Sequence, residues 1–299
     1  MNTSEKNTST CANCGKGEEA SIDLKSCAAY KLVKYCSRDC QIAHRPQHKK
    51  DCKKRAKELH DEKIFKQPPP LEDCPICMIR LPDYTKQTYM VCCGKNICCG
   101  CIYAVQIRDG GFGLCPFCRT PAPTSKEEII KRYTKRVEYS DTDADAVSCL
   151  GSFYYHGRYG LRHNRAKALE LWHRAAELGH VGAYTSIGRA YHDGHGVERD
   201  EKKAKHYFEL GAMGGNIHAR HNLGAMVSRS GNYDRALKHW MIAVRDGNPD
   251  SLECIKSMYI CGKVTKDDYS KASRSYQAYL DEVKSDQRDE AAAAGSNSI

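Results

Sequence analysis

The chain has 299 residues, which is enough for two or three domains of ordinary size. Charged residues make up 28% of the sequence and its mean hydropathy is −0.66, so we expect a soluble protein. No apolar run follows Met1, which argues against a signal peptide and a membrane-spanning helix. The formal charge of +10 predicts a basic surface.

Cysteine is the most informative residue type in this sequence. Of the 18 cysteines, fifteen lie between Cys11 and Cys118, and many of them form C-x2-C pairs. Such pairs, in a chain without a secretory signal, favour zinc over disulfides and a reducing compartment. We therefore expect an intracellular zinc protein of the cytoplasm or the nucleus.

The first cysteine cluster, residues 11–52, follows a polar segment, residues 1–10, that we expect to be disordered. The cluster comprises Cys11-x2-Cys14, Cys27, Tyr35-Cys36-x3-Cys40-Gln41 and His48-x3-Cys52. This order resembles the MYND finger, a two-zinc module that binds short, often proline-rich peptides. The resemblance implies one zinc site made of Cys11, Cys14, Cys36 and Cys40.

For the second zinc ion of the finger, the resemblance leaves only Cys27, His48 and Cys52, because Tyr30 stands where the family has a further cysteine. His44 precedes His48 by one helical turn, so it could supply the fourth ligand, or it could be a surface histidine. Together with two sites farther along the chain, we expect four zinc ions, or three if the finger has lost this one.

Residues 53–73 combine a basic helix with a proline-rich linker. The stretch from Lys49 to Lys57 favours a helix, and the prolines at 68–70 predict a stiff, extended spacer. Basic runs can contact nucleic acid, but this one has no interleaved aromatic residues on which bases could stack. We interpret it as a solvated helix face.

The second cluster, residues 74–124, contains four cysteine pairs. They are Cys74-x2-Cys77, Cys92-Cys93, Cys98-x2-Cys101 and Cys115-x2-Cys118, which offer eight ligands for two tetrahedral zinc ions. A segment this short has too little apolar surface to fold alone. Metal binding, at about 10–16 kcal/mol, would supply the folding energy.

This order of pairs resembles the RING finger, in which pairs one and three hold one zinc ion and pairs two and four hold the other. The resemblance implies one site of Cys74, Cys77, Cys98 and Cys101 and one of Cys92, Cys93, Cys115 and Cys118. Lys95 departs from the family, which usually has a histidine there. Cys92 would then complete an all-cysteine RING and leave Cys99 unused. A remnant with a single zinc ion is the alternative.

RING fingers bind a ubiquitin-conjugating enzyme and position its ubiquitin thioester, without a covalent intermediate of their own. Three residues match the family's contact positions: Ile76, Pro116 and Arg119. Each also has a simpler interpretation. Ile76 could pack the zinc loop, Pro116 is common in C-P-x-C knuckles, and Arg119 could neutralise the charge of the thiolates.

Residues 125–145 predict a helical connector, and residues 146–283 are repetitive. A Leu-Gly or Ile-Gly pair recurs at Leu150, Ile187 and Leu223, and an alanine followed four positions later by an aromatic residue recurs in step. Asn164, Asp200 and Asp234 stand where the second helix of each unit needs an N-cap. A period of about 36 residues predicts an α-solenoid of about four helix-loop-helix repeats.

The units resemble Sel-1-like repeats, whose members are scaffolds that hold partners on a curved helical surface. The second unit carries the pattern most fully, with Ile187, Gly188, Tyr191, Gly194, Gly196, Val197, Asp200, Lys203 and Ala204. An ordinary helical bundle is the alternative. The tail, residues 284–299, is low in complexity, and we expect it to be disordered.

The sequence therefore predicts small zinc-stabilised α+β modules, MYND-like and RING-like, followed by an all-α solenoid. Our first hypothesis is a RING-type ubiquitin ligase that recruits a ubiquitin-conjugating enzyme through the RING. In this hypothesis the finger and the repeats bind substrate, or other protein and peptide partners. The alternative is a non-enzymatic zinc-finger scaffold for protein–protein interaction.

Overall fold

The computed structural model describes residues 10–17, 23–27, 33–68, 72–82, 86–108, 110, 113–140 and 142–295. These residues belong to two compact units, Met1–Lys66 and Gln67–Ile299, which we describe separately. Predictions that concern residues 1–9, Tyr30, the prolines at 69 and 70, and residues 296–299 lie outside the described residues.

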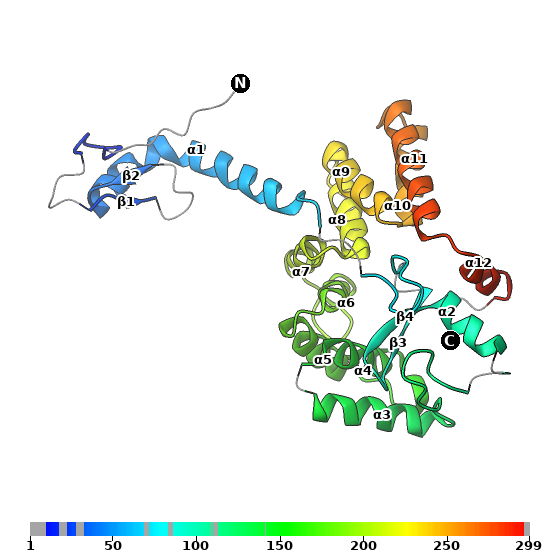
Figure 1. Cartoon of the computed structure of the whole chain (residues 1–299). Coiled ribbons are helices and arrows are strands. Elements are labelled where there is room, and N and C mark those ends of the chain that lie inside the picture. Colours follow the sequence, from blue (N-terminus) through cyan, green and yellow to red (C-terminus); the bar gives the residue numbers. More distant parts are fainter. Residues whose placement is uncertain are drawn as a thin grey trace. The chain divides into compact units, whose positions relative to one another are not determined.

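The first unit contains the finger, residues 11–52. Strands β1 (Lys25–Ser26) and β2 (Lys34–Tyr35) pair antiparallel and precede helix α1 (Arg38–Ile64). The helix begins at Ser37, whose side chain accepts a hydrogen bond from the Cys40 amide at 3.2 Å and so satisfies a free N–H of the first turn. The same helix carries the last finger cysteine and the basic stretch without interruption (Figure 1).

The second unit begins with the RING-like module, residues 74–124. Strands β3 (Gln87–Met90) and β4 (Lys95–Cys98) form a hairpin that leads into helix α2 (Cys99–Arg108). Its buried core is very small and consists of Cys74, Leu81, Ile97, Cys98, Cys101 and Ile102. Half of these side chains are cysteines, so the apolar core alone is very small for a module of this length.

The rest of the second unit is helical and stacks along the chain, as Figure 1 shows. After α3 (Lys126–Tyr139) come four helix pairs: α4 (Ala144–His156) with α5 (Arg165–Glu177), α6 (Val181–Asp193) with α7 (Glu201–Met213), α8 (Ile217–Arg229) with α9 (Tyr233–Arg245), and α10 (Pro249–Ile260) with α11 (Lys266–Val283). A short 3-10 turn, η2 (Arg158–Gly160), lies between α4 and α5. This architecture confirms the predicted fold class. No helix in the described ranges has both the length and the apolar content that a membrane span requires.

The recurring glycine and aromatic residue meet where the two helices of a unit cross. A Cβ atom on Gly188 would lie 2.7 Å from the ring of Phe208, and one on Gly151 would lie 2.9 Å from the ring of Trp172. Real side chains do not approach so closely. The glycine therefore lets the aromatic ring of the second helix press against the backbone of the first, which fixes the spacing of each pair.

The predicted N-caps are correct in two of the three units. Asn164 and Asp200 cap α5 and α7 through their side chains, but α9 is capped by Asn232, and Asp234 lies in its first turn. The prediction for Asp234 is wrong because the loop before α9 is shorter than that before α7. Gly231, with a φ of 80°, ends the preceding helix one residue before the cap.

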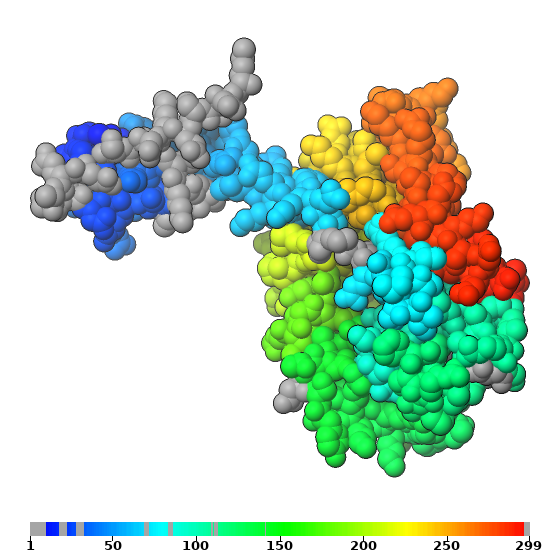
Figure 2. Space-filling view, viewed as in Figure 1, coloured from blue at the N-terminus to red at the C-terminus, as the bar shows by residue number. Residues whose placement is uncertain are grey.

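The prediction that the chain is disordered from residue 284 is also wrong for the described part of the tail. Residues Asp286–Ala293 form helix α12, which is capped by Ser285 and buries Arg288 and Ala291. This helix packs against α2 of the RING-like module, and Figure 2 shows the red C-terminal segment against the cyan and teal module. An alanine-rich polar run has no apolar period, so only this tertiary contact reveals it as an ordered helix.

Candidate metal centres

The first zinc site that the sequence predicts in the RING-like module is assembled from two distant segments. Cys74 and Cys77 lie on a turn, and Cys98 and Cys101 lie at the end of β4 and the start of α2. The four sulfur atoms lie within 4.8 Å of one another, with Cys74–Cys101 and Cys77–Cys98 each at 3.9 Å. Four thiolates at about 2.3 Å from a tetrahedral zinc ion would be about 3.8 Å apart, so this group fits zinc.

The second site brings together Cys92, Cys93, Cys115 and Cys118. Its Cys93–Cys115 and Cys92–Cys118 sulfur distances are 3.9 and 3.4 Å, which also fit a tetrahedral zinc ion. Burial raises the pKa of Cys92 and raises that of Cys93 to about 11. Both thiols would hold their protons at neutral pH without a metal, so zinc must displace protons as it binds.

In both sites, a residue with a positive φ directly follows the second cysteine of a C-x2-C pair. Met78 follows Cys77 with a φ of 55°, and Arg119 follows Cys118 with a φ of 61°. In each knuckle the amide of this left-handed residue donates to the carbonyl group of the first cysteine, Met78 N to Cys74 O at 2.9 Å and Arg119 N to Cys115 O at 3.0 Å. The left-handed residue closes a tight turn that aims both sulfurs at one point.

The ligand pairs alternate along the chain between the two sites. Pairs one and three form the first site, and pairs two and four form the second. Strand β4, which pairs with β3, connects pair two to pair three along the chain. The structure thus brings together both sets that the RING resemblance implies. Cys99 belongs to neither group of described residues and begins α2 instead.

In the finger, Cys11, Cys14, Cys36 and Cys40 form a third four-sulfur group. Cys14 and Cys36 lie 3.5 Å apart, and Cys36 and Cys40 lie 3.6 Å apart. The first turn of α1 supplies Cys40, and the end of the β-hairpin supplies Cys36. This arrangement again suits one tetrahedral zinc ion.

The fourth group contains Cys27, His48 and Cys52. Cys27 and Cys52 lie 3.6 Å apart, and His48 is buried. His44 is not part of this described group. Its Nδ1 atom lies 3.0 Å from the Tyr35 hydroxyl group, and its ring stacks on His48 with 5.7 Å between the ring centres. The structure therefore gives His44 a partner other than the metal group, namely Tyr35. The position where the family has a further cysteine, Tyr30, lies outside the described residues.

The three predicted partner residues lie on the knuckles of the RING-like module. Ile76 is 39% exposed, Arg119 is exposed, and Pro116 is half-buried and lines an apolar cavity of about 200 Å³ against α3. Further exposed apolar side chains lie nearby in sequence, namely Met78, Ile107, Leu114 and Phe117. The sequence did not single out these four, although each stands next to a cysteine pair or at the end of α2.

The RING-like module is joined to the first repeat through polar side chains. The hydroxyl group of Tyr89 on β3 donates to Asp143 at 2.7 Å, and Arg136 on α3 pairs with the same carboxylate. Partial burial favours the neutral acid, but hydrogen bonds from the Ala146 amide, Tyr89 and Arg136 outweigh it and lower the pKa of Asp143. Tyr89 and Val91 also pack against the apolar core of the first repeat.

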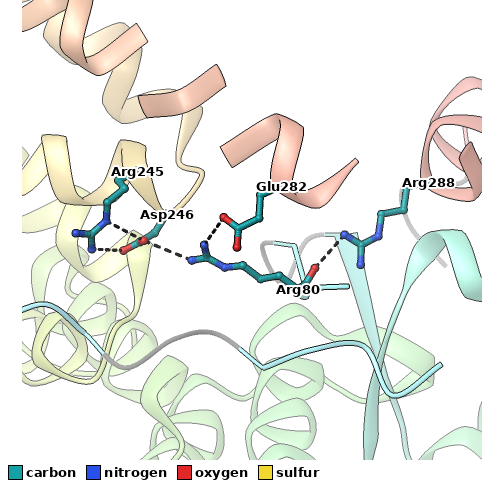
Figure 3. A network of polar contacts seen from close by, with 5 residues as sticks. All are labelled: Arg80, Arg245, Asp246, Glu282 and Arg288. Carbon is teal, nitrogen blue, oxygen red and sulfur yellow. Dashed lines mark hydrogen bonds and ion pairs between the residues drawn. The ribbon is translucent and has the colours of Figure 1, made fainter. Parts of the chain in front are cut away.

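A second set of residues contacts the first site from the C-terminal end of the chain. Arg288 on α12 lies 3.7 Å from Cys77 Sγ, and the side-chain amide of Gln287 lies 3.9 Å from Cys101 Sγ. Arg80, three residues after Cys77, forms ion pairs with Asp246 and Glu282 (Figure 3). Sequence reasoning missed these residues because nothing local connects positions about 200 residues apart.

A basic groove of about 520 Å³ lies along α1 in the finger, and the fourth metal group, Cys27, His48 and Cys52, forms part of its lining. Tyr35, Gln41 and the exposed Ile42 form part of its wall. Four cations stand around it, namely Arg38, Arg45, Lys49 and Lys53. A groove of this kind can hold a short extended peptide with an apolar side chain and acidic neighbours.

Comparison with known proteins supports the two outer parts of the chain. Residues 11–52 match the family model of the MYND finger, and residues 146–180 and 182–216 match that of the Sel1 repeat. Both resemblances are thereby confirmed. A MYND finger implies zinc binding, and both families are modules of protein–protein interaction.

One curated relative is the "ERAD-associated E3 ubiquitin-protein ligase component HRD3B" of Arabidopsis thaliana. It is 32% identical over 106 residues, which are 34% of this chain and 16% of that protein. This chain thus spans less than a fifth of the length of that relative.

Among solved structures, a Sel1 repeat protein from Oxalobacter formigenes is 29% identical, with a TM-score of 0.46 over 52% of this chain and 64% of that chain. The protective antigen c5321 of uropathogenic Escherichia coli, which displays an SLR fold, is 22% identical, with a TM-score of 0.45 over 61% of this chain and 37% of that chain. The matches identify residues 11–52 of this chain as a MYND finger and residues 146–180 and 182–216 as Sel1 repeats.

Proposed function

We propose that the chain is a zinc-dependent adaptor of ubiquitin transfer that works in the cytoplasm or the nucleus. In this proposal the RING-like module docks a ubiquitin-conjugating enzyme, while the finger and the repeats bind substrate or other proteins. The module forms no covalent intermediate and acts by positioning the ubiquitin thioester for attack. The alternating assembly of two four-sulfur groups carries the proposal.

The position of the predicted contact residues supports this function. Ile76 and Arg119 are exposed on the two knuckles, so neither is buried by the repeats or by α12. An apolar side chain on one knuckle can pack against a loop of the conjugating enzyme. The arginine on the other can donate several hydrogen bonds at once, across the junction between that enzyme and ubiquitin.

We further propose that the chain binds four zinc ions, or three if the group of Cys27, His48 and Cys52 holds none. In the zinc-bound finger, the basic groove along α1 would bind a peptide with acidic residues. The four cations around the groove thus favour acidic residues in the peptide, in addition to any preference for proline. The name of the Arabidopsis relative, a component of a ubiquitin ligase, agrees with a role beside ubiquitin transfer.

The test is ubiquitin discharge with the purified full chain and a panel of charged conjugating enzymes. We expect the chain to accelerate discharge with at least one of them, and Ile76→Ala and Arg119→Ala to reduce the rate about tenfold or more, the loss of roughly 1.4 kcal/mol of docking or transition-state energy. Ile260→Ala and Arg199→Ala are matched controls, because both side chains are exposed on the repeats. Equal loss in the controls would contradict the assignment of the two knuckle residues.

A non-enzymatic scaffold is the second candidate. It is favoured by the two confirmed families, which both bind proteins, and by the attachment of the RING-like module to the first repeat through Tyr89 and Asp143. A scaffold predicts no acceleration with any conjugating enzyme, together with zinc-dependent capture of an acidic peptide by the finger. That combination of results would replace the first proposal with the second.

A further inference from the structure

The side chain of Arg288 on α12 is buried beside the first site of the RING-like module. The residue is only 8% exposed. One guanidinium nitrogen donates to the carbonyl oxygens of Arg80 at 2.9 Å and Val283 at 2.8 Å. The other donates to the carbonyl oxygen of Ile79 at 3.3 Å and to Cys77 Sγ at 3.7 Å. Arg288 thus fastens α12 to the loop that follows the first two zinc ligands.

This guanidinium has no carboxylate partner among the described residues. Its acceptors are carbonyl oxygens and a cysteine sulfur. Burying a cation without a counter-charge is costly, so an anion nearby would stabilise this arrangement. A zinc ion held by four thiolates carries a net charge of −2, and the first site would place that charge next to Arg288.

The backbone of α2 is shaped to admit α12 at this point. A Cβ atom on Gly100, between Cys98 and Cys101, would lie 2.8 Å from the backbone nitrogen of Arg288 and 2.9 Å from the carbonyl carbon of Gln287. Any larger residue at position 100 would therefore push α12 away. The side-chain oxygen of the neighbouring Gln287 lies 3.9 Å from Cys101 Sγ.

A second arginine ties the same loop to the end of the repeats. Arg80 forms ion pairs with Glu282 at 3.0 Å and with Asp246 at 3.4 Å, and its guanidinium group lies 5.8 Å from the centre of the Tyr279 ring. Asp246 is buried and is also paired with Arg245 (Figure 3). Arg80 therefore has carboxylate partners of its own, whereas Arg288 has none among the described residues.

We infer that residues 285–293, the C-terminal latch, are held closed by zinc in the first site, and that Arg288 is a positioning residue of that site. Because the coupling is reciprocal, zinc binds more tightly when the latch is closed, and the latch opens when the first site loses its metal. The closed latch fixes the Ile76 knuckle relative to the last repeat. The inference requires zinc in the first site but not ubiquitin transfer.

The experiment follows zinc loss cysteine by cysteine in the full chain. The zinc-loaded protein is mixed with a chelator and an alkylating reagent, digested with trypsin and analysed by mass spectrometry. Cleavage after Arg108 separates Cys98 and Cys101 from Cys115 and Cys118, so the two sites report separately. For Arg288→Ala we expect labelling of Cys98 and Cys101 to be about tenfold faster, the usual effect of removing an outer-shell partner of a metal.

Two further variants separate charge from shape. Arg288→Lys keeps the charge but loses the planar fork, so we expect a smaller acceleration. Gly100→Ala favours the helical conformation of α2, yet it blocks α12, so it should accelerate labelling like Arg288→Ala. Arg274→Ala, at an exposed position of α11, and Gly113→Ala, where a Cβ atom meets nothing within 4 Å, are the matched controls and should behave like the wild type.

Hydrogen exchange supplies the reverse measurement. Chelation should raise the exchange rate of the amides in residues 286–293, while α5 and α7 of the repeats keep theirs. The inference is wrong if Arg288→Ala and Gly100→Ala release zinc at the wild-type rate. It is also wrong if both variants release zinc from the second site as fast as from the first, since that result would indicate general unfolding. Failure of ubiquitin discharge alone would leave it standing.

Discussion

The finger and the RING-like module both depend on cysteine, but they differ in what else stabilises them. The finger has a buried core of Cys11, Leu24, Cys27 and Tyr35. Of its two candidate metal groups, one has four described members and the other has three. The RING-like module has two groups of four cysteine sulfurs and also packs against the first repeat and against α12. The comparison shows that the RING-like module has support from neighbouring helices, in addition to its cysteine groups, of a kind that the finger's described core does not have.

Removal of zinc should separate these two cases most clearly. After chelation we expect the amides of residues 11–52 to lose nearly all protection from hydrogen exchange, because about 10–16 kcal/mol of binding energy per site disappears. Strand β3 should keep partial protection, because Tyr89 and Val91 remain packed on the repeats. Hydrogen exchange read by mass spectrometry measures both. A finger that stays protected without metal would contradict this account.

The finger group with three described members, Cys27, His48 and Cys52, can be tested through His48 and the neighbouring His44. His48→Ala should remove one zinc ion from the chain, whereas His44→Ala should leave the zinc number unchanged, because His44 contacts Tyr35 and lies outside the described metal group. Native mass spectrometry counts the ions directly. Equal loss in both variants would show that His44 is a ligand and would reverse the assignment made here.

The contact between the RING-like module and the first repeat should contribute a smaller amount. Asp143→Ala removes the N-cap of α4 and leaves Tyr89 and Arg136 without their shared carboxylate, so the free energy of unfolding of this region should fall by about 2 kcal/mol. Tyr89→Phe removes a single hydrogen bond and should cost about 1 kcal/mol. Urea denaturation of the zinc-loaded chain gives both values. An Asp143 variant as stable as the wild type would show that the contact contributes nothing.

The smallest expected effect concerns a helix cap. Asn232→Ala should lower the free energy of unfolding by about 1 kcal/mol, because its side chain accepts a hydrogen bond from the Arg235 amide. Asp234→Ala should change it by no more than a few tenths of a kcal/mol, because that carboxylate only interacts with the positive end of α9. The same urea titration compares the free energies of unfolding of the two variants. A larger loss for Asp234→Ala than for Asn232→Ala would show that Asp234 is the cap, as the sequence predicted.

Several local features could be predicted because they are encoded by neighbours in the chain. Asn164 and Asp200 cap their helices because each comes just before a run that favours a helix. The prediction that Asp234 caps α9 was wrong because two residues that can cap a helix, Asn232 and Asp234, stand two positions apart. The length of the preceding loop decides between them. The pairs of Gly188 with Phe208 and of Gly151 with Trp172 explain why a glycine and an aromatic residue recur in step.

By itself, the sequence determined the order of cysteine-rich modules and helical repeats, because the spacing of cysteines and the period near 36 residues are local properties of the chain. Only the tertiary structure decided that residues Asp286–Ala293 form a helix, that Arg288 lies beside the first site and that Arg80 pairs with Glu282. The physical reason is that a polar, alanine-rich segment has no preferred partner in its own sequence. It is ordered because Gly100 and the carbonyl groups of Ile79 and Arg80, all far away along the chain, lie next to it and accommodate its buried Arg288.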